Sequence, residues 1–68
     1  MARDIKNCLR KKDAKWLPVA DAFADVPLLK GLLGSARPHT ACSLLKVALH
    51  GSGLLAEVRE GVLFVGGA

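Results

Sequence analysis

Apolar and polar residues alternate along residues 54–66, on both sides of the pair Glu60-Gly61. Alternation with a period of two predicts strands, and a two-residue loop of this kind predicts a β-hairpin that pairs Arg59 with Val62 and Val58 with Leu63. One face of the hairpin then faces a core, and it comprises Leu54, Ala56, Val58, Leu63 and Val65. The opposite face points outward and comprises Leu55, Glu57, Arg59, Val62 and Phe64.

The first half of the chain has a different periodicity. Residues 3–12 place Ile5, Cys8 and Leu9 on one stripe at helical spacing, with charged residues elsewhere, which predicts a short amphipathic helix. Residues 16–19, Trp-Leu-Pro-Val, then favour an extended segment. The proline within this segment indicates a short strand at the edge of a sheet.

Two further helical regions lie between that strand and the hairpin. Residues 20–33 carry apolar residues at spacings of three and four, and Pro27 either breaks this region or opens a second helix within it. Gly34 and Ser35 end it, and residues 36–40 are expected to be a linker with Thr40 as the N-cap of the next helix. That helix spans residues 41–50. Its expected apolar face comprises Ala41, Leu44, Leu45, Ala48 and Leu49.

The predicted order of elements is helix, short strand, two helices and a C-terminal hairpin. This is the order of a small α+β winged-helix domain, in which the hairpin at residues 54–66 is the wing. The short strand would complete a sheet, because an isolated hairpin is barely stable in water. The length of the chain allows one domain, residues 1–68.

Two segments resemble part of a known family. The runs KWLPVADAF and LLKVALHGSGLLAEV are similar to the second half of the La motif, a winged-helix variant of RNA-binding proteins. The matching positions lie within residues 15–58: Trp16, Leu17, Pro18, Val19, Phe23, Ala48, Leu49, Ser52, Glu57 and Val58. The resemblance implies RNA binding, and of the family's pocket for the RNA 3′ end only Phe23 has a counterpart. The element order also fits other winged-helix families, including LOTUS-type domains.

Positive charge is concentrated at one end of the sequence. Residues 1–15 contain six basic and two acidic side chains, whereas the rest of the chain is neutral overall, for a net charge of +4. Such asymmetry indicates a polyanionic partner. The alternative is a solvated first helix without a ligand.

The candidate nucleic-acid-binding residues come from several predicted elements. On the helix at residues 41–50, His39, Ser43, Lys46 and His50 are expected to point outward, and few of these can contact phosphates or base edges. On the wing, Arg59 beside Phe64 offers a guanidinium and an aromatic ring, a combination that binds single-stranded bases. The complete candidate set is Arg10, Lys11, Lys12, Lys15, Phe23, Lys46, Arg59 and Phe64.

Other kinds of site find little support in the sequence. Cys8, His39, Cys42 and His50 do not have a zinc-binding spacing, so we expect two free, buried cysteines and neither metal nor cofactor. Ser43 and His50 are too far apart on a helix to form a nucleophile and base, and we expect no catalysis. No apolar run is long enough to span a membrane, and the Leu-rich run at residues 27–36 is expected to be a core helix.

Two functions remain. RNA binding, with single-stranded DNA as a second ligand, follows from the basic end and the wing. The alternative is a protein-docking subunit of a larger assembly, favoured by the apolar composition. Two cysteines and no visible secretory signal indicate a reducing intracellular compartment, the cytoplasm or the nucleus.

Overall fold

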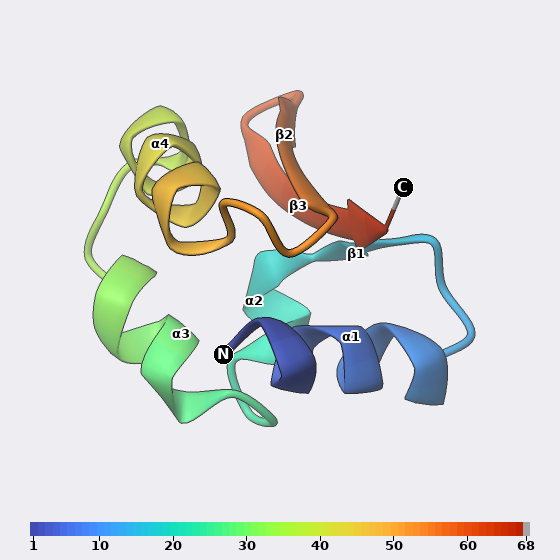
Figure 1. Cartoon of the computed structure of the whole chain (residues 1–68). Coiled ribbons are helices and arrows are strands. Elements are labelled where there is room, and N and C mark those ends of the chain that lie inside the picture. The colour runs from blue at the N-terminus through green and yellow to red at the C-terminus, as the bar shows by residue number, and fades with distance from the viewer. Residues whose placement is uncertain (68) are drawn as a thin grey trace.

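The computed structural model describes residues 1–67, which form four helices and three strands (Figure 1). In chain order these are α1 (Ala2–Lys11), β1 (Trp16–Pro18), α2 (Val19–Ala22), α3 (Pro27–Leu33), α4 (Pro38–Ala48), β2 (Leu54–Arg59) and β3 (Val62–Gly67). The chain is a small α+β domain of winged-helix-like topology, as the sequence predicts.

The three strands form one antiparallel sheet in the order β1-β3-β2. The predicted register is confirmed, because Val58 pairs with Leu63 and Arg59 with Val62. Glu60 and Gly61 both have positive φ, 52° and 77°, as the type I′ turn of a tight hairpin requires. Leu63 and Val65 are buried on the inner face of the sheet.

The short strand β1 lies at one edge of the sheet, as predicted, and Leu17 pairs with Val65. Pro18 is tolerated there because an edge strand leaves one side of its backbone unpaired. Val19 was expected in the strand and instead begins α2, a single turn of helix. Pro27 occupies the first turn of α3, so the region at residues 20–33 is two helices rather than one.

Helix α4 differs from the prediction in its start, in its end, which is Ala48 rather than His50, and in its buried face. The expected linker residues Pro38, His39 and Thr40 lie within the helix, and Arg37 is its N-cap in place of Thr40. The physical reason is that the fixed φ of proline suits the first helical turn. Leu44 and Ala48 are exposed, whereas Ala41, Cys42, Leu45 and Leu49 are buried. The buried face of α4 is therefore rotated toward Cys42 relative to the predicted one.

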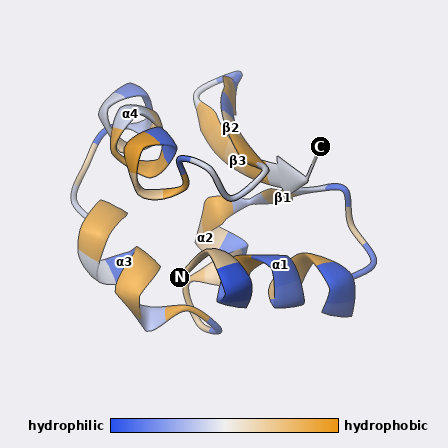
Figure 2. Cartoon of the chain, viewed as in Figure 1, coloured by the Kyte–Doolittle hydropathy of each residue, from blue (hydrophilic) through white to orange (hydrophobic). Residues whose placement is uncertain are grey.

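The core lies between the inner face of the sheet and the helices. Ile5, Cys8 and Leu9 are the buried residues of α1, as the apolar stripe predicts. Figure 1 shows α4 beside the hairpin, with α1 lying below β1. Figure 2 shows that the turns of α1 nearest the viewer carry hydrophilic residues, whereas much of β2 and β3 is hydrophobic. Within residues 1–67, no helix has the length and apolar character needed to cross a membrane.

The outer face of the sheet holds one close contact between β1 and β3. A side-chain carbon placed at Gly66 would lie 2.5 Å from Cδ2 of Trp16 and 2.7 Å from the Lys15 carbonyl oxygen. Only glycine leaves room for the indole ring to lie across β3 at this point. The Trp16 ring therefore packs directly on Gly66, its partner in the neighbouring strand.

Replacing Gly66 with alanine is expected to destabilise the domain by about 1–3 kcal/mol, because the new methyl group must displace the indole or the β1 backbone. Urea unfolding followed by Trp16 fluorescence measures both the stability and the ring's environment. Gly67→Ala is the matched control, since nothing lies within 4 Å of a side-chain carbon there. Equal effects of the two substitutions would contradict this packing.

Candidate nucleic-acid interface

Trp16, Arg59 and Phe64 lie together on the outer face of the sheet, one from each strand, and we name these three residues the aromatic face. The guanidinium carbon of Arg59 is 5.0 Å from the centre of the Trp16 ring and 6.0 Å from that of Phe64. Both distances fall within the range of a cation–π interaction. Arg59 projects from the hairpin end of β2, so its side chain reaches back along the sheet to contact both rings.

Glu57 fixes the position of Arg59. Arg59 Nη2 donates a hydrogen bond to Glu57 Oε2 at 2.9 Å, and both side chains are about half exposed. This hydrogen bond lowers the pKa of Glu57 below its ordinary value of 4.5 and raises the pKa of Arg59. Because the folded-state pKa of Glu57 is depressed, the pair stabilises the fold above about pH 4.5. That contribution is lost as the pH falls through the folded-state pKa.

A groove continues from the aromatic face toward α4. It is lined by Trp16 and Leu55 on the sheet and by Lys46 and His50 near the end of the helix. The positive charge of Lys46 also helps to lower the pKa of Glu57, which places this lysine near the outer face. The exposed side of α4 thus contributes one cation to the same side of the molecule as the aromatic face.

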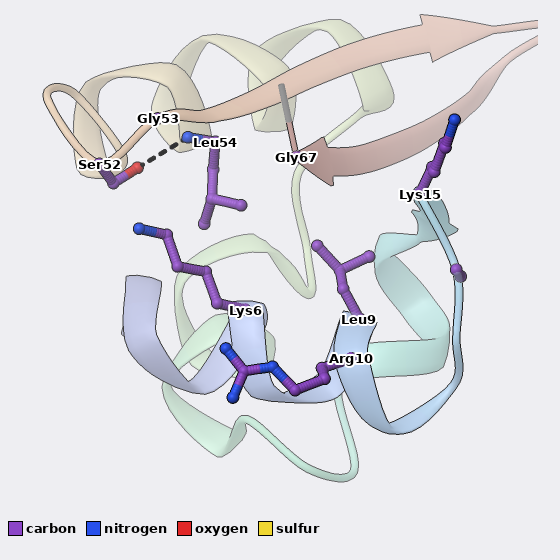
Figure 3. A pocket seen from close by; sticks show the side chains of 9 residues that line it. Lys6, Leu9, Arg10, Lys15, Ser52, Gly53, Leu54 and Gly67 are labelled. Carbon is purple, nitrogen blue, oxygen red and sulfur yellow. Dashed lines mark hydrogen bonds between the residues drawn. The ribbon is translucent and has the colours of Figure 1, made fainter.

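The basic residues of the N-terminal segment do not form one cluster. Lys6, Arg10 and Lys15 line a hollow of about 660 Å³ between α1 and the end of the sheet, and we name it the basic hollow. Figure 3 shows Lys6 and Arg10 extending from α1 below the Ser52–Leu54 turn, whereas Lys15 lies at the other end of the hollow and its side chain points away from them. Lys11 instead lines a smaller hollow that also contains Asp4 and Asp25.

Two other predicted site residues lie apart from the aromatic face. Lys12 is exposed at the end of α1. It lies two positions after Arg10, the last residue of α1 that lines the basic hollow. Phe23 is half-buried against the core and lines a hollow beneath the hairpin loop, together with Gly61 and Leu63. The fold thus brings together Arg59, Phe64 and Lys46 on one side, and Arg10 with Lys15 at the end of the sheet.

Trp16 and Lys6 line these sites but were not among the predicted site residues. Trp16 carried a signal, because alternation in β1 with Leu17 inward places the tryptophan outward, on the face of Phe64. The sequence signal for Lys6 as a site residue was weaker. Lys6 lies one helical turn before Arg10, and residues four apart share a face of a helix.

Both cysteines are free and buried, as expected. Burial raises the pKa of the Cys8 thiol, and the neighbouring Asp25 carboxylate, 3.5 Å from Sγ, acts in the same direction. A thiol with a raised pKa is a poor nucleophile at neutral pH. Within residues 1–67, no three potential metal ligands of the His, Cys, Asp and Glu types lie close enough together to hold an ion.

We expect Cys8 and Cys42 to react with a thiol reagent only after the domain is unfolded, because both are shielded by the core. The rates with and without urea, measured with a chromogenic disulfide, test this expectation. Elemental analysis of protein purified without chelator tests the absence of metal. Stoichiometric zinc, or rapid labelling of the folded protein, would show the expectation to be wrong.

Comparisons with protein-family models, with curated proteins and with solved structures find no match to this chain.

Proposed function

We propose that this domain is a non-catalytic RNA-binding module that holds a single strand against the outer face of its sheet. The observation that carries the proposal is the position of Arg59 within cation–π distance of both Trp16 and Phe64. Aromatic rings stack with unpaired bases, and a guanidinium group beside them stacks with a base or neutralises a phosphate. Single-stranded nucleic acid is the ligand class that uses both properties at once.

The charge distribution supports the same ligand. The net charge of +4 arises from residues 1–15, and Lys15 directly precedes Trp16. A strand stacked on the aromatic face therefore lies next to the basic end of the molecule. Phosphates of the strand would lie near Arg10, Lys15 and Lys46, while Arg59 and Phe64 contact bases.

The composition of α4 favours this face over the usual recognition helix. The exposed side of α4 includes His39, Ser43 and Lys46, and the exposed His50 follows the helix by two positions. Lys46 is the one strongly basic residue among these four. Sequence-specific readers of duplex DNA place several Arg, Asn or Gln side chains on such a helix to bond base edges in the major groove. We therefore propose single-stranded RNA as the main ligand and single-stranded DNA as a weaker one.

The resemblance to the La motif supports RNA as the ligand class, although the mode of binding proposed here differs. Phe23, the one counterpart to that family's 3′-end pocket, packs beneath the hairpin loop. It lies on the inner side of the sheet, whereas the aromatic face lies on the outer side. We propose that Phe23 serves the core and that the strand is held by the three residues of the aromatic face.

Fluorescence anisotropy with labelled single-stranded RNA, single-stranded DNA and duplex DNA tests the proposal. We expect both single strands to bind at about 50 mM salt and to weaken steeply by about 200 mM, because phosphate contacts release counterions. Duplex DNA is expected to bind more weakly, since its bases are not free to stack. No measurable binding of any nucleic acid at low salt would overturn the proposal.

A protein-docking module is the second candidate. It is favoured by apolar side chains that remain exposed on α3 and α4, of which Leu28 and Val47 are 70% and 79% exposed. A docking module would bind none of the three nucleic acids in the anisotropy experiment. That outcome would favour protein docking through the exposed apolar side chains of α3 and α4.

A further inference from the structure

We infer that the basic hollow is a phosphate-binding site, and that it takes a phosphate of the same strand whose base stacks on the aromatic face. The source of the phosphate rests on the proposed function, whereas the site itself rests on the geometry of the hollow. Of the basic residues in the N-terminal segment, those that line the hollow would then contact the phosphate, and the others would contribute only long-range positive charge.

Within residues 1–67, the charged residues that line the hollow all have the same sign. Lys6, Arg10 and Lys15 line it, and no acidic residue of this range does. Among residues 1–67 the only ion pair joins Glu57 and Arg59, so these three cations have no anionic partner in the described part of the chain. Lys6 and Arg10 both extend from α1 beside the Ser52–Leu54 turn, whereas the Lys15 side chain points away from them (Figure 3). Two unpaired cations side by side attract an anion more strongly than the same charges pointing in different directions.

The walls of the hollow strengthen this attraction. Leu9 and Leu54 line it and are less than 10% exposed, so the cations lie against apolar surface. Apolar walls reduce screening and focus the electric field of the charges. The Ser52 hydroxyl accepts a hydrogen bond from the Leu54 backbone N–H and donates one to the Leu49 carbonyl oxygen, which fixes the turn above Lys6 (Figure 3).

The size and place of the hollow fit a phosphate on a nucleic-acid strand. Its volume of about 660 Å³ admits a phosphate together with its attached sugar. Gly53 and Leu54 line both this hollow and the groove that contains Trp16. The two sites therefore adjoin around one turn, and a strand can pass from the aromatic face into the hollow.

Helix α1 provides a matched pair of variants. Lys6→Gln/Arg10→Gln removes two charges from the hollow, and Lys11→Gln/Lys12→Gln removes two charges from the same helix outside it. All four side chains are exposed, so both variants should fold, which circular dichroism checks. Any difference between them then reports the hollow and not the net charge.

The first measurement uses inorganic phosphate and nitrogen-15 NMR of the whole domain. We expect saturable shifts at the amides of Gly53 and Gly67, retained in Lys11→Gln/Lys12→Gln and lost in Lys6→Gln/Arg10→Gln. Shifts spread evenly along α1, or shifts at these glycines that persist in Lys6→Gln/Arg10→Gln, would overturn the site. This measurement does not depend on RNA binding.

The second measurement uses single-stranded RNA. We expect Lys6→Gln/Arg10→Gln to weaken binding by about tenfold or more at low salt and to flatten the salt dependence by about 0.7–1.4 units. The control variant should weaken binding by about twofold or less, because only long-range charge is removed. Equal losses in the two variants would overturn the inference while leaving RNA binding intact. If the wild-type domain binds no RNA, the proposed function fails and the phosphate titration alone decides the site.

Discussion

Replacing Leu45 with alanine is expected to lower the free energy of unfolding by about 2–5 kcal/mol, a large fraction of the total stability of so small a domain. Leu45 is 0% exposed and lies in α4, which packs against β2 and β3. Its truncation removes buried apolar surface and leaves a cavity between helix and sheet. A domain of this size has a total stability of only about 3–10 kcal/mol.

Val47→Ala is the control for this prediction. Val47 lies on the same helix and is 79% exposed, so its truncation should change stability by about 0.5 kcal/mol or less. Thermal and urea unfolding followed by circular dichroism compare the two variants. A stable Leu45→Ala variant with cooperative unfolding near that of the wild type would show that α4 does not pack as described.

Loss of either ring of the aromatic face is expected to reduce affinity for single-stranded RNA by about 5- to 150-fold, which corresponds to about 1–3 kcal/mol for each base that stacks. Phe64→Ala is the cleaner test, because Trp16 also packs across Gly66. The salt dependence of binding should change little, since no phosphate contact is removed. Anisotropy titrations at several salt concentrations separate these two quantities.

Leu55→Ala is the matched control for the aromatic face. Leu55 lies on the same outer face, in β2, and is about half exposed, but it has no ring on which a base can stack. We expect its truncation to leave affinity within about twofold of the wild type. Equal losses for Leu55→Ala and Phe64→Ala would indicate a general apolar contact. That result would contradict base stacking on Phe64.

The sheet was the most predictable part of the fold. The alternation at residues 54–66 and the Glu60-Gly61 loop fix both the faces and the register, because a shift by one residue would exchange the two faces. The boundaries of α4 were less predictable. Proline at its first turn and threonine two residues later are each compatible with a linker or with a helix, so the sequence pattern alone does not show where the helix begins.

The candidate site was predicted only in part. Arg59 and Phe64 could be placed on one face because both lie in the hairpin, where local pairing determines neighbours. Trp16 joins them through the pairing of β1 with β3, which connects residues far apart in the sequence. The division between Lys6 with Arg10 and Lys11 with Lys12 depends on where α1 lies against the sheet. Sequence spacing along one short helix does not contain that information.

The hydrogen bond between Arg59 and Glu57 has a consequence for the thermodynamics of binding. A free arginine side chain samples many rotamers, and immobilising such a side chain on binding costs about 0.5–1.5 kcal/mol in conformational entropy. Arg59 is restrained by Glu57 and by two rings before any strand arrives, so most of this entropy is already lost in the free protein. Lys6 and Arg10 have no such restraint and lose theirs only on binding. The side-chain conformational entropy that is lost when the complex forms is therefore lost mainly at the basic hollow and little at the aromatic face.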